Sequence, residues 1–332
     1  MAEPPAGFEE TVAAIADDVL FAQALDVDQR AEIPASHFRA LAEAGLFGIA
    51  GPVDAGGLDL DPRAQRRVRE TLAGGCLTTA FVWAQHQGVV RRLRDAPAEL
   101  RDAWLHDLCA GRTLGGLVLA GLLPGEPLLR IQPAHDGFTI RGTAPAVSGW
   151  GHVGILLVTA RSAPDEVVYV LVDPHSTGLH VRPRALAALN GTKTIGLEFH
   201  TVRVPASAVV AREPVPPWAA AGEGVRANGA FSVGVANRCA RICDEPWLRS
   251  EVDERRAALD RAADGDELAQ ARADAALFAA RAASYLVAAR GSSAIDLREH
   301  AQRLAREATF LLAFGQRPAI KRALLEALAQ IP

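Results

Sequence analysis

The spacing of the hydrophobic positions changes twice along the chain. In residues 8–111 apolar side chains recur every three or four positions, which is the period of an amphipathic helix. One such helix is predicted around Phe38, Leu41 and Ala42, with Ser36 as its N-cap and Gly45 as its end. Another is predicted over residues 80–93. A further helical face is defined by Phe8, Val12, Ile15 and Val19, and the helix over residues 80–93 carries Phe81, Val82 and Val89.

Between about residues 113 and 210 the helical period gives way to short β-prone runs. Turn residues such as Pro124-Gly125, Asp136-Gly137 and Asn190-Gly191 separate these runs. Many short strands at close intervals predict a small β-barrel or β-sandwich. The expected strands are residues 117–119, 128–132, 138–140, 155–160, 167–172 and 194–199.

Helical spacing returns after a proline-rich linker, Pro214–Trp218. Asp264 and Glu267 have the spacing of a capping box that would begin a long helix, and a last helix is expected at about residues 297–312. The expected inner positions of these two helices are Leu268, Ala271, Ala275, Phe278, Ala282, Tyr285, Leu304, Ala308 and Leu311.

The three periods predict an α+β protein of three domains. Residues 1–112 form an N-terminal helical domain, residues 113–213 a middle β domain, and residues 214–332 a C-terminal helical bundle. The alanine-rich stripes of the last part favour close helix packing within a bundle or across a subunit interface.

A glycine pattern in the middle domain imitates a nucleotide-binding motif. Gly149, Gly151 and Gly154 spell GxGxxG, and Asp173 lies near the distance expected of a ribose-binding carboxylate. A dinucleotide-binding turn opens a helix, however, whereas two β-prone runs follow these glycines with a Pro/Asp turn between them. The pattern therefore predicts a hairpin and argues against a Rossmann domain.

Composition narrows the possible partners. Of 332 residues, 49% are hydrophobic and 22% charged, and the net charge is -4, which indicates a globular protein without the basic surface that nucleic acids need. The arginines around Arg66-Arg67 and Arg91-Arg92 are expected to be solvated helix faces. The four cysteines suggest no metal site or disulfide framework. With no apolar leader and no run long enough for a membrane span, the protein is expected in the cytoplasm.

Three stretches resemble the acyl-CoA dehydrogenase superfamily, which has the same order of domains. They are "LAEAGLFGIAGPVDAGGLDL" (41–60), "TKTIGLEFHTVRVPASAVV" (192–210) and "AQRLAREATFLL" (301–312). The resemblance spans nearly the whole chain and implies an FAD-dependent oxidoreductase that acts on an acyl thioester.

The resemblance also implies a flavin site. In this family a Trp-aliphatic-Thr/Ser segment at the end of a β-hairpin contacts the isoalloxazine ring, and Ala146-Val147-Ser148 matches it. Ser148 would supply the contact, Gly149 would permit close approach of the backbone, and the tryptophan is displaced to Trp150. A second flavin-facing element matches Leu119, Ala120 and Gly121, which have no hydroxyl groups and would bind through the backbone and apolar packing.

The resemblance does not extend to the catalytic base that acyl-CoA dehydrogenation needs. The position of the family's glutamate is Gly315, and the alternative position on the preceding bundle helix has no acid except Glu223 nearby. His86 and His152 are the remaining acid–base candidates, each weighed against a purely structural role. The Arg-x-x-Phe-Gly segment that grips FAD from a neighbouring subunit is also missing, and residues 244–256 stand in its place.

Three functions are therefore compared. The first is α,β-oxidation of an acyl-CoA or acyl-carrier thioester with FAD as hydride acceptor. The second is a flavin-dependent monooxygenase, to which the segment "SGWGH" points and which needs no α-proton base. The third is a degenerate subunit that partners a complete homologue. A homo- or hetero-oligomer, dimer or tetramer, is expected in each case, and the acyl group and electron partner are left open.

Overall fold

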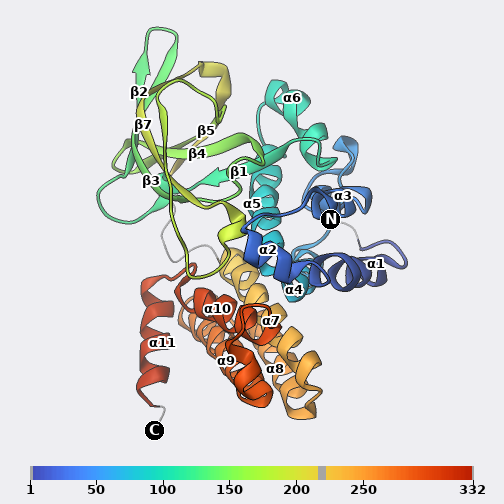
Figure 1. The fold of residues 1–332 in the computed structure, drawn as a ribbon. Coiled ribbons are helices and arrows are strands. Elements are labelled where there is room, and N and C mark those ends of the chain that lie inside the picture. The colour runs from blue at the N-terminus through green and yellow to red at the C-terminus, as the bar shows by residue number, and fades with distance from the viewer. Residues whose placement is uncertain (1–2, 216–221, 331–332) are drawn as a thin grey trace.

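The computed structural model describes residues 3–215 and 222–330, which form three parts around the central helix α5 (Figure 1). The N-terminal helices, drawn in blue and cyan, and the green β-sheet lie side by side above the orange and red C-terminal helices. The predicted α+β fold, with helices, sheet and helices in that order, is confirmed. Pro214 ends the last strand, and the predicted linker from residue 216 onward lies outside the described residues.

Short helices and one long buried helix make up the N-terminal part. Ser36 does not cap α3, because that helix begins at Ala35 after Pro34 and the Ser36 hydroxyl instead donates to Gln23 Oε1 at 3.1 Å. Gly45 does end it, with a left-handed backbone (φ 68°) that suits glycine. The elements are α1 (Phe8–Ala14), a π-helical turn (Ile15–Phe21), α2 (Ala24–Arg30), α3 (Ala35–Glu43), α4 (Pro62–Gly75), α5 (Leu77–Leu93) and α6 (Ala98–Cys109).

The middle part is one eight-stranded mixed sheet. Its order is β6-β7-β3-β2-β4-β5-β8, and β1 pairs with β4 in parallel. The glycines of the GxGxxG pattern lie before and at the start of β4, which forms an antiparallel hairpin with β5, so the predicted hairpin is confirmed. The strands are β1 (Leu114–Val118), β2 (Leu129–Ala134), β3 (Gly137–Val147), β4 (Val153–Ala163), β5 (Glu166–Val172), β6 (Leu179–Arg182), β7 (Ile195–Val204) and β8 (Val209–Pro214).

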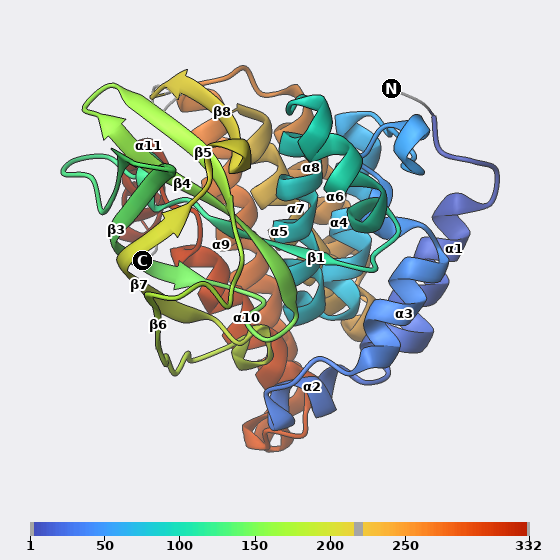
Figure 2. The same ribbon diagram turned by 90° about the horizontal axis from the view of Figure 1, so that it is seen from above.

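The C-terminal bundle buries the predicted inner stripe except Tyr285, which is 36% exposed. The predicted capping box is wrong: Asp264 pairs with Arg226 at 2.7 Å, and Glu267 Oε2 accepts the amide of Ala263, not that of Asp264. Gly265 precedes the helix in place of an acidic cap. The helices are α7 (Gly222–Cys243), α8 (Pro246–Arg261), α9 (Asp266–Arg290), α10 (His300–Ala313) and α11 (Pro318–Ala329), which lie below the sheet and the N-terminal helices in Figure 1 and behind them in Figure 2.

Arginines join α4 to the bundle. Arg66 pairs with Glu223 at 2.6 Å and with Asp260 at 3.0 Å, and Arg256 pairs with Glu70 at 2.6 Å. The expectation that Arg66-Arg67 forms a solvated face is therefore wrong. Glu70 of the same helix pairs with Arg67 at 3.2 Å, but the other acids come from α7 and α8, more than 150 residues away in sequence, so no local pattern reveals them.

The described parts of the chain show neither a membrane helix nor a metal cluster. No helix within residues 3–215 and 222–330 is long and apolar enough to cross a membrane. No group of three His, Cys, Asp or Glu side chains in these ranges could hold a metal ion. Cys76, Cys109, Cys239 and Cys243 are free thiols.

Two glycines allow α4 and α7 to cross closely. A Cβ atom at Gly234 would lie 2.2 Å from the carbonyl oxygen of Glu70, and one at Gly74 would lie 3.0 Å from the carbonyl oxygen of Gly234. Both contacts are to backbone atoms, which cannot swing aside. The crossing therefore requires glycine at position 234.

We expect Gly234→Ala to lower the free energy of unfolding by about 1–3 kcal/mol, since the methyl group forces the two helices apart. Urea denaturation measures this change. Gly224→Ala, at an exposed position of the same helix, is the matched control and should leave stability unchanged or raise it by up to ~1 kcal/mol, because alanine favours the helix. Equal stability of Gly234→Ala and the wild type would contradict the close crossing.

Candidate functional site

Two consecutive residues of α5 connect the predicted flavin-facing loop to the C-terminal bundle. A Cβ atom at Gly149 would lie 3.3 Å from Cγ1 of Val82, so the loop lies directly against this helix. Next to Val82, the ring of Phe81 lies 5.8 Å from that of Phe231 and 4.8 Å from that of Phe314. The loop after β3 and the turn after α10 thus meet neighbouring positions on one helix.

Ser148 and Gly149 form a tight turn between β3 and β4. Gly149 has a φ of 86°, in the left-handed region that favours glycine, and its amide donates to the carbonyl oxygen of Thr192 at 2.7 Å. Val147 precedes them with its side chain buried in the core of the β domain. Of the matched Ala-Val-Ser segment, Ser148 is therefore the residue with a half-buried polar side chain.

The Ser148 hydroxyl begins a chain of three hydroxyl groups. Its Oγ lies 2.7 Å from Thr194 Oγ1, which lies 2.7 Å from Thr192 Oγ1. Thr192 donates to the carbonyl oxygen of Leu189, also at 2.7 Å. Because a carbonyl only accepts and each hydroxyl has one hydrogen, Thr194 must donate to Thr192, and Ser148 must donate to Thr194. Ser148 can therefore only accept a hydrogen bond from a bound group.

The second flavin-facing element, Leu119 to Gly121, is already bonded within the protein. The Gly121 amide donates to Thr159 Oγ1 at 3.2 Å, and its carbonyl oxygen accepts from Arg161. Ala120 is buried, whereas Leu119 is 43% exposed. The Gly121 backbone is thus committed to the sheet, and Leu119 offers apolar surface.

Trp150 and His152 line a separate pocket of about 500 Å³ at the edge of the β domain. The His152 ring packs 5.0 Å from that of Phe38, and burial lowers the pKa of His152 below its usual value. Glu32 and Lys193 share this pocket. Burial thus favours the neutral imidazole of His152, and a carboxylate and an ammonium group line the same pocket. Ser148 is not among the residues that line the pocket.

His86 is held at both ring nitrogens. Its Nε2 donates to the carbonyl oxygen of Phe47 at 3.2 Å, and its Nδ1 accepts from the amide of Gly115 at 3.0 Å. Complete burial lowers the pKa of His86 to about 4. No ring nitrogen is left for a substrate, so these contacts favour the structural role over the acid–base role.

Gly315 occupies a turn that disfavours a catalytic side chain. Its φ is 65°, and a Cβ atom there would lie 2.9 Å from Nδ2 of Asn228 on α7. The buried Arg272 fixes the turn by donating to the carbonyl oxygens of Leu311 and Phe314, at 3.2 and 3.3 Å. A glutamate at this position would be strained both in its backbone and against Asn228.

Arg69 is a buried charge near this turn, and it was not among the residues singled out from the sequence. Only 9% of the residue is exposed, and its guanidinium carbon lies 5.2 Å from the centre of the Phe231 ring. Burial lowers its pKa to about 10. The spacing of the arginines in α4 could have indicated this different position, because Arg69 is offset from Arg66 and Arg67, which face Asp260 on α8.

The two other acidic or basic segments considered from the sequence are structural. Glu223 lies in the first turn of α7, not in a loop, and pairs with Arg66. Residues 246–256, which lie where the FAD-gripping segment was expected, belong to α8, whose Arg256 binds Glu70 through two nitrogens.

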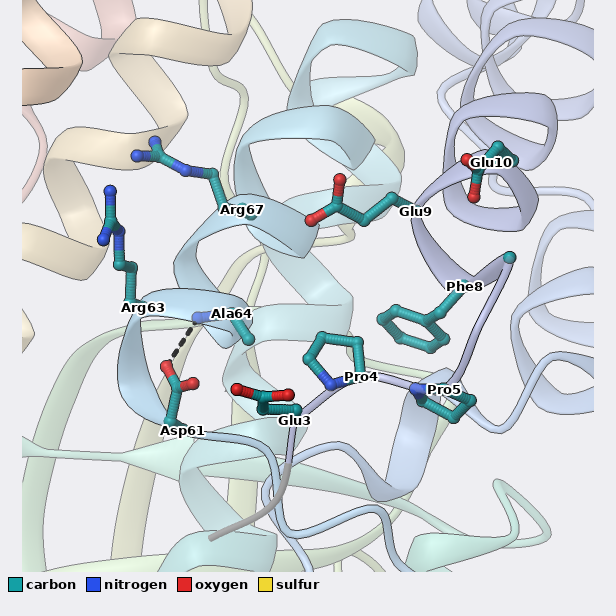
Figure 3. Close-up of a pocket in the computed structure, with 11 residues that line it drawn as sticks. Glu3, Pro4, Pro5, Phe8, Glu9, Glu10, Asp61, Arg63, Ala64 and Arg67 are labelled. Carbon is teal, nitrogen blue, oxygen red and sulfur yellow. Dashed lines mark hydrogen bonds between the residues drawn. The ribbon is translucent and has the colours of Figure 1, made fainter.

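A pocket of about 550 Å³ lies at the N-terminal end of the chain, between the segment before α1 and the start of α4 (Figure 3). Two of its polar groups are engaged within the protein: Asp61 caps α4 by accepting the Ala64 amide at 2.9 Å, and Arg67 pairs with Asp260. None of the predicted flavin or acid–base residues lines it.

Comparison with known proteins points to one family. Residues 6–112 match the model of the acyl-CoA dehydrogenase N-terminal domain. The N-terminal helical part of the chain is therefore similar to the acyl-CoA dehydrogenase superfamily. A curated superfamily relative, the acryloyl-CoA reductase (NADH) of Anaerotignum propionicum, is 24% identical over 202 residues, which cover 57% of this chain and 51% of the relative. The chain spans about half or less of the length of the curated relatives that it matches.

Solved structures extend the likeness in fold to the whole chain. Butyryl-CoA dehydrogenase from Megasphaera elsdenii superposes with a TM-score of 0.83 at 15% identity and covers 99% of this chain and 100% of its own. A glutaryl-CoA dehydrogenase from Mycobacterium smegmatis, solved in complex with FADH2, superposes with a TM-score of 0.80 at 16% identity, covering 98% and 94%. The superfamily fold is thus present from end to end.

The pKa of His86 predicts loss of stability in acid. Since the folded-state pKa of about 4 lies below the ordinary 6.5, the unfolded chain binds the proton first as the pH falls. Between pH 6.5 and about 4 this residue should therefore cost about 1.4 kcal/mol of unfolding free energy per pH unit. Urea denaturation across this range measures the slope.

His86→Gln is the matched variant, because its amide keeps one donor and one acceptor but does not titrate. We expect a shallower pH dependence by about that amount, provided the variant folds at pH 7. An unchanged slope would show that His86 does not titrate differently on folding.

Proposed function

We propose that this chain is a FAD-binding oxidoreductase that acts on an acyl thioester with the flavin entering in its reduced form, as in a flavin-dependent monooxygenase. When bound, the flavin would supply two electrons, so that one atom of O2 enters a C–H bond of the substrate and the other leaves as water. The observation that carries this proposal is the direction of the hydroxyl chain from Ser148.

Oxidised and reduced flavins differ at N5 of the isoalloxazine ring, the ring that the matched hydroxyl of this family contacts. N5 of an oxidised flavin accepts a hydrogen bond, whereas N5–H of a reduced flavin donates one. The Ser148 hydroxyl donates its one hydrogen bond to Thr194. Its remaining lone pairs can therefore accept a hydrogen bond from N5–H of a reduced flavin. The absence of a side chain at Gly149 lets the turn pack against Val82 and Val153, which holds Ser148 in place.

The turn at Gly315 argues against the first hypothesis, α,β-dehydrogenation. That reaction needs a base for the α-proton, and the position that matches the family's glutamate offers only backbone and the nearby Asn228 amide, which is no base. His86 is engaged at both nitrogens. Oxygenation needs no base at this place, so of the two redox reactions it fits these residues better.

One observation supports the degenerate-subunit hypothesis. Residues that stand where the family's FAD-gripping segment is expected belong to α8, and α8 forms an ion pair with α4. Under it, this chain would bind flavin only beside a complete homologue. The expected oligomer and the carrier of the acyl group, CoA or a carrier protein, remain part of this proposal, as does the cytoplasmic location.

The function is tested by adding oxidised FAD, or FAD reduced under anaerobic conditions, to the purified protein with a panel of acyl-CoAs. We expect no bleaching of oxidised FAD by any acyl-CoA. We expect reduced FAD to bind and, on admission of oxygen, an acyl product heavier by one oxygen atom in mass spectrometry. Bleaching by an acyl-CoA would instead establish dehydrogenation, and flavin binding only after co-expression with a homologue would establish the degenerate subunit.

The hydroxyl chain makes a separate prediction for the midpoint potential of bound FAD. Thr194→Val breaks the chain and frees the Ser148 hydrogen to donate toward oxidised N5. Since one neutral hydrogen bond is worth about 0.5–1.5 kcal/mol, the potential should fall by about 10–30 mV relative to the wild type.

Ser148→Ala should likewise lower the potential, because it removes the acceptor for N5–H. Ser207→Ala, at an exposed position of the same domain, is the control and should leave the potential unchanged. A potential that is unaffected by Thr194→Val, or that rises, would overturn the assigned direction of the hydroxyl chain.

A further inference from the structure

Arg69 has no ion-pair partner in the described parts of the chain. Its Nε is buried without a hydrogen-bond partner, and no carboxylate within residues 3–215 and 222–330 pairs with its guanidinium. Only 9% of the residue is exposed, so water cannot surround the group. A buried, unpaired cation is costly, which makes its presence in a folded core unusual.

The charges around Arg69 increase this cost. Arg66 and Arg91 lie close enough to lower its pKa further, and Glu223 opposes them. Glu223 is itself bonded to Arg66 at 2.6 Å. The surroundings of Arg69 therefore hold an excess of positive charge that a bound anion would neutralise.

Arg69 stands beside the turn that replaces the family's base. Its guanidinium lies over the ring of Phe231, which is one helical turn from Asn228 on α7. Asn228 in turn lies against Gly315, and Phe231 packs near Phe314 with ring centres 6.1 Å apart. A ligand group that reached Arg69 would thus lie in the region where the superfamily handles its acyl group.

We propose that Arg69 binds a carboxylate carried by the acyl part of the substrate, so that the preferred substrate is an acyl thioester with a second, free acid group. This inference rests on the proposed function for the thioester, but the charge at Arg69 stands independently of flavin. A guanidinium donates through a planar set of N–H groups that matches a carboxylate, and the apolar ring beneath it excludes water from the contact. The neutral amide of Asn228 offers a further donor nearby without adding charge.

Binding of two thioesters of equal chain length tests the proposal. Succinyl-CoA and butyryl-CoA differ in whether the acyl chain ends in a carboxylate or a methyl group. The wild-type protein should bind succinyl-CoA more tightly by about tenfold to a hundredfold, the value of a hydrogen bond to a charged group. Free succinate shows whether the carboxylate alone suffices. Equal affinity for the two thioesters, measured by calorimetry, would overturn the proposal.

Arg69→Met separates a ligand site from a packing role. Methionine retains an unbranched apolar chain over Phe231 but has no charge, so the ligand-free variant should melt at the same temperature as the wild type or higher. Its preference for succinyl-CoA over butyryl-CoA should be lost. Arg67→Met is the matched control: because Arg67 is paired with Asp260 at 2.8 Å, this variant should melt lower and keep the preference.

A lower melting temperature of Arg69→Met with an unchanged preference would assign Arg69 to packing and overturn the inference. Should the methionine variant not fold, Arg69→Lys keeps the charge and loses the planar donors, and an intermediate preference is then expected. These measurements use protein without flavin. Failure of FAD to bind would therefore contradict the proposed function while leaving the carboxylate preference to be judged separately.

Discussion

Buried polar side chains of helix α5 pair the backbone groups of two neighbouring segments, a loop and a strand. His86 donates to the loop at Phe47 and accepts from the first strand at Gly115. Trp83 and Gln87 both donate to the carbonyl oxygen of Leu46 in the same loop. Because buried backbone groups must be paired, these side chains complete the hydrogen bonding of a loop and a strand end that no regular structure covers. The position of α5 thereby fixes where the Ser148 turn and the phenylalanines of the bundle meet.

Protein groups of opposite charge or dipole stabilise several buried arginines of this protein, and Arg69 is an exception. Arg66 has carboxylates from two helices, Arg303 has Glu307 at 2.7 Å, and Arg272 lies on the carbonyl end of α10, where the helix dipole is negative. Each buried guanidinium of this kind has a protein group that stabilises it. Arg69 differs in having an aromatic ring and other cations as its neighbours. A departure from a rule that the rest of the fold obeys is the pattern expected at a functional site.

Sequence patterns predicted the long elements well because each has a repeating apolar face. Helix α9 buries Leu268 through Ala282 as its spacing indicated, and the β4–β5 hairpin follows from two β-prone runs around a turn. Short strands without such a face, β6 and β8, were not predicted, because exposed residues such as Val181 leave no alternation to detect. The solvated interpretation of Arg66 failed for another reason: its acids lie in distant segments that only the fold brings near. The direction of the hydroxyl chain could not be predicted from the sequence either, because it depends on the carbonyl oxygen of Leu189, which accepts from Thr192.

The glycine contact between α4 and α7 has a mechanical consequence. Backbone atoms of Glu70 and Gly234 lie so close that one helix cannot slide along the other without a collision. Any relative movement of α4 and α7 at this crossing therefore requires that the two helices first separate. The same contact ties the N-terminal helices to the bundle through the backbone itself, independently of the arginine ion pairs nearby.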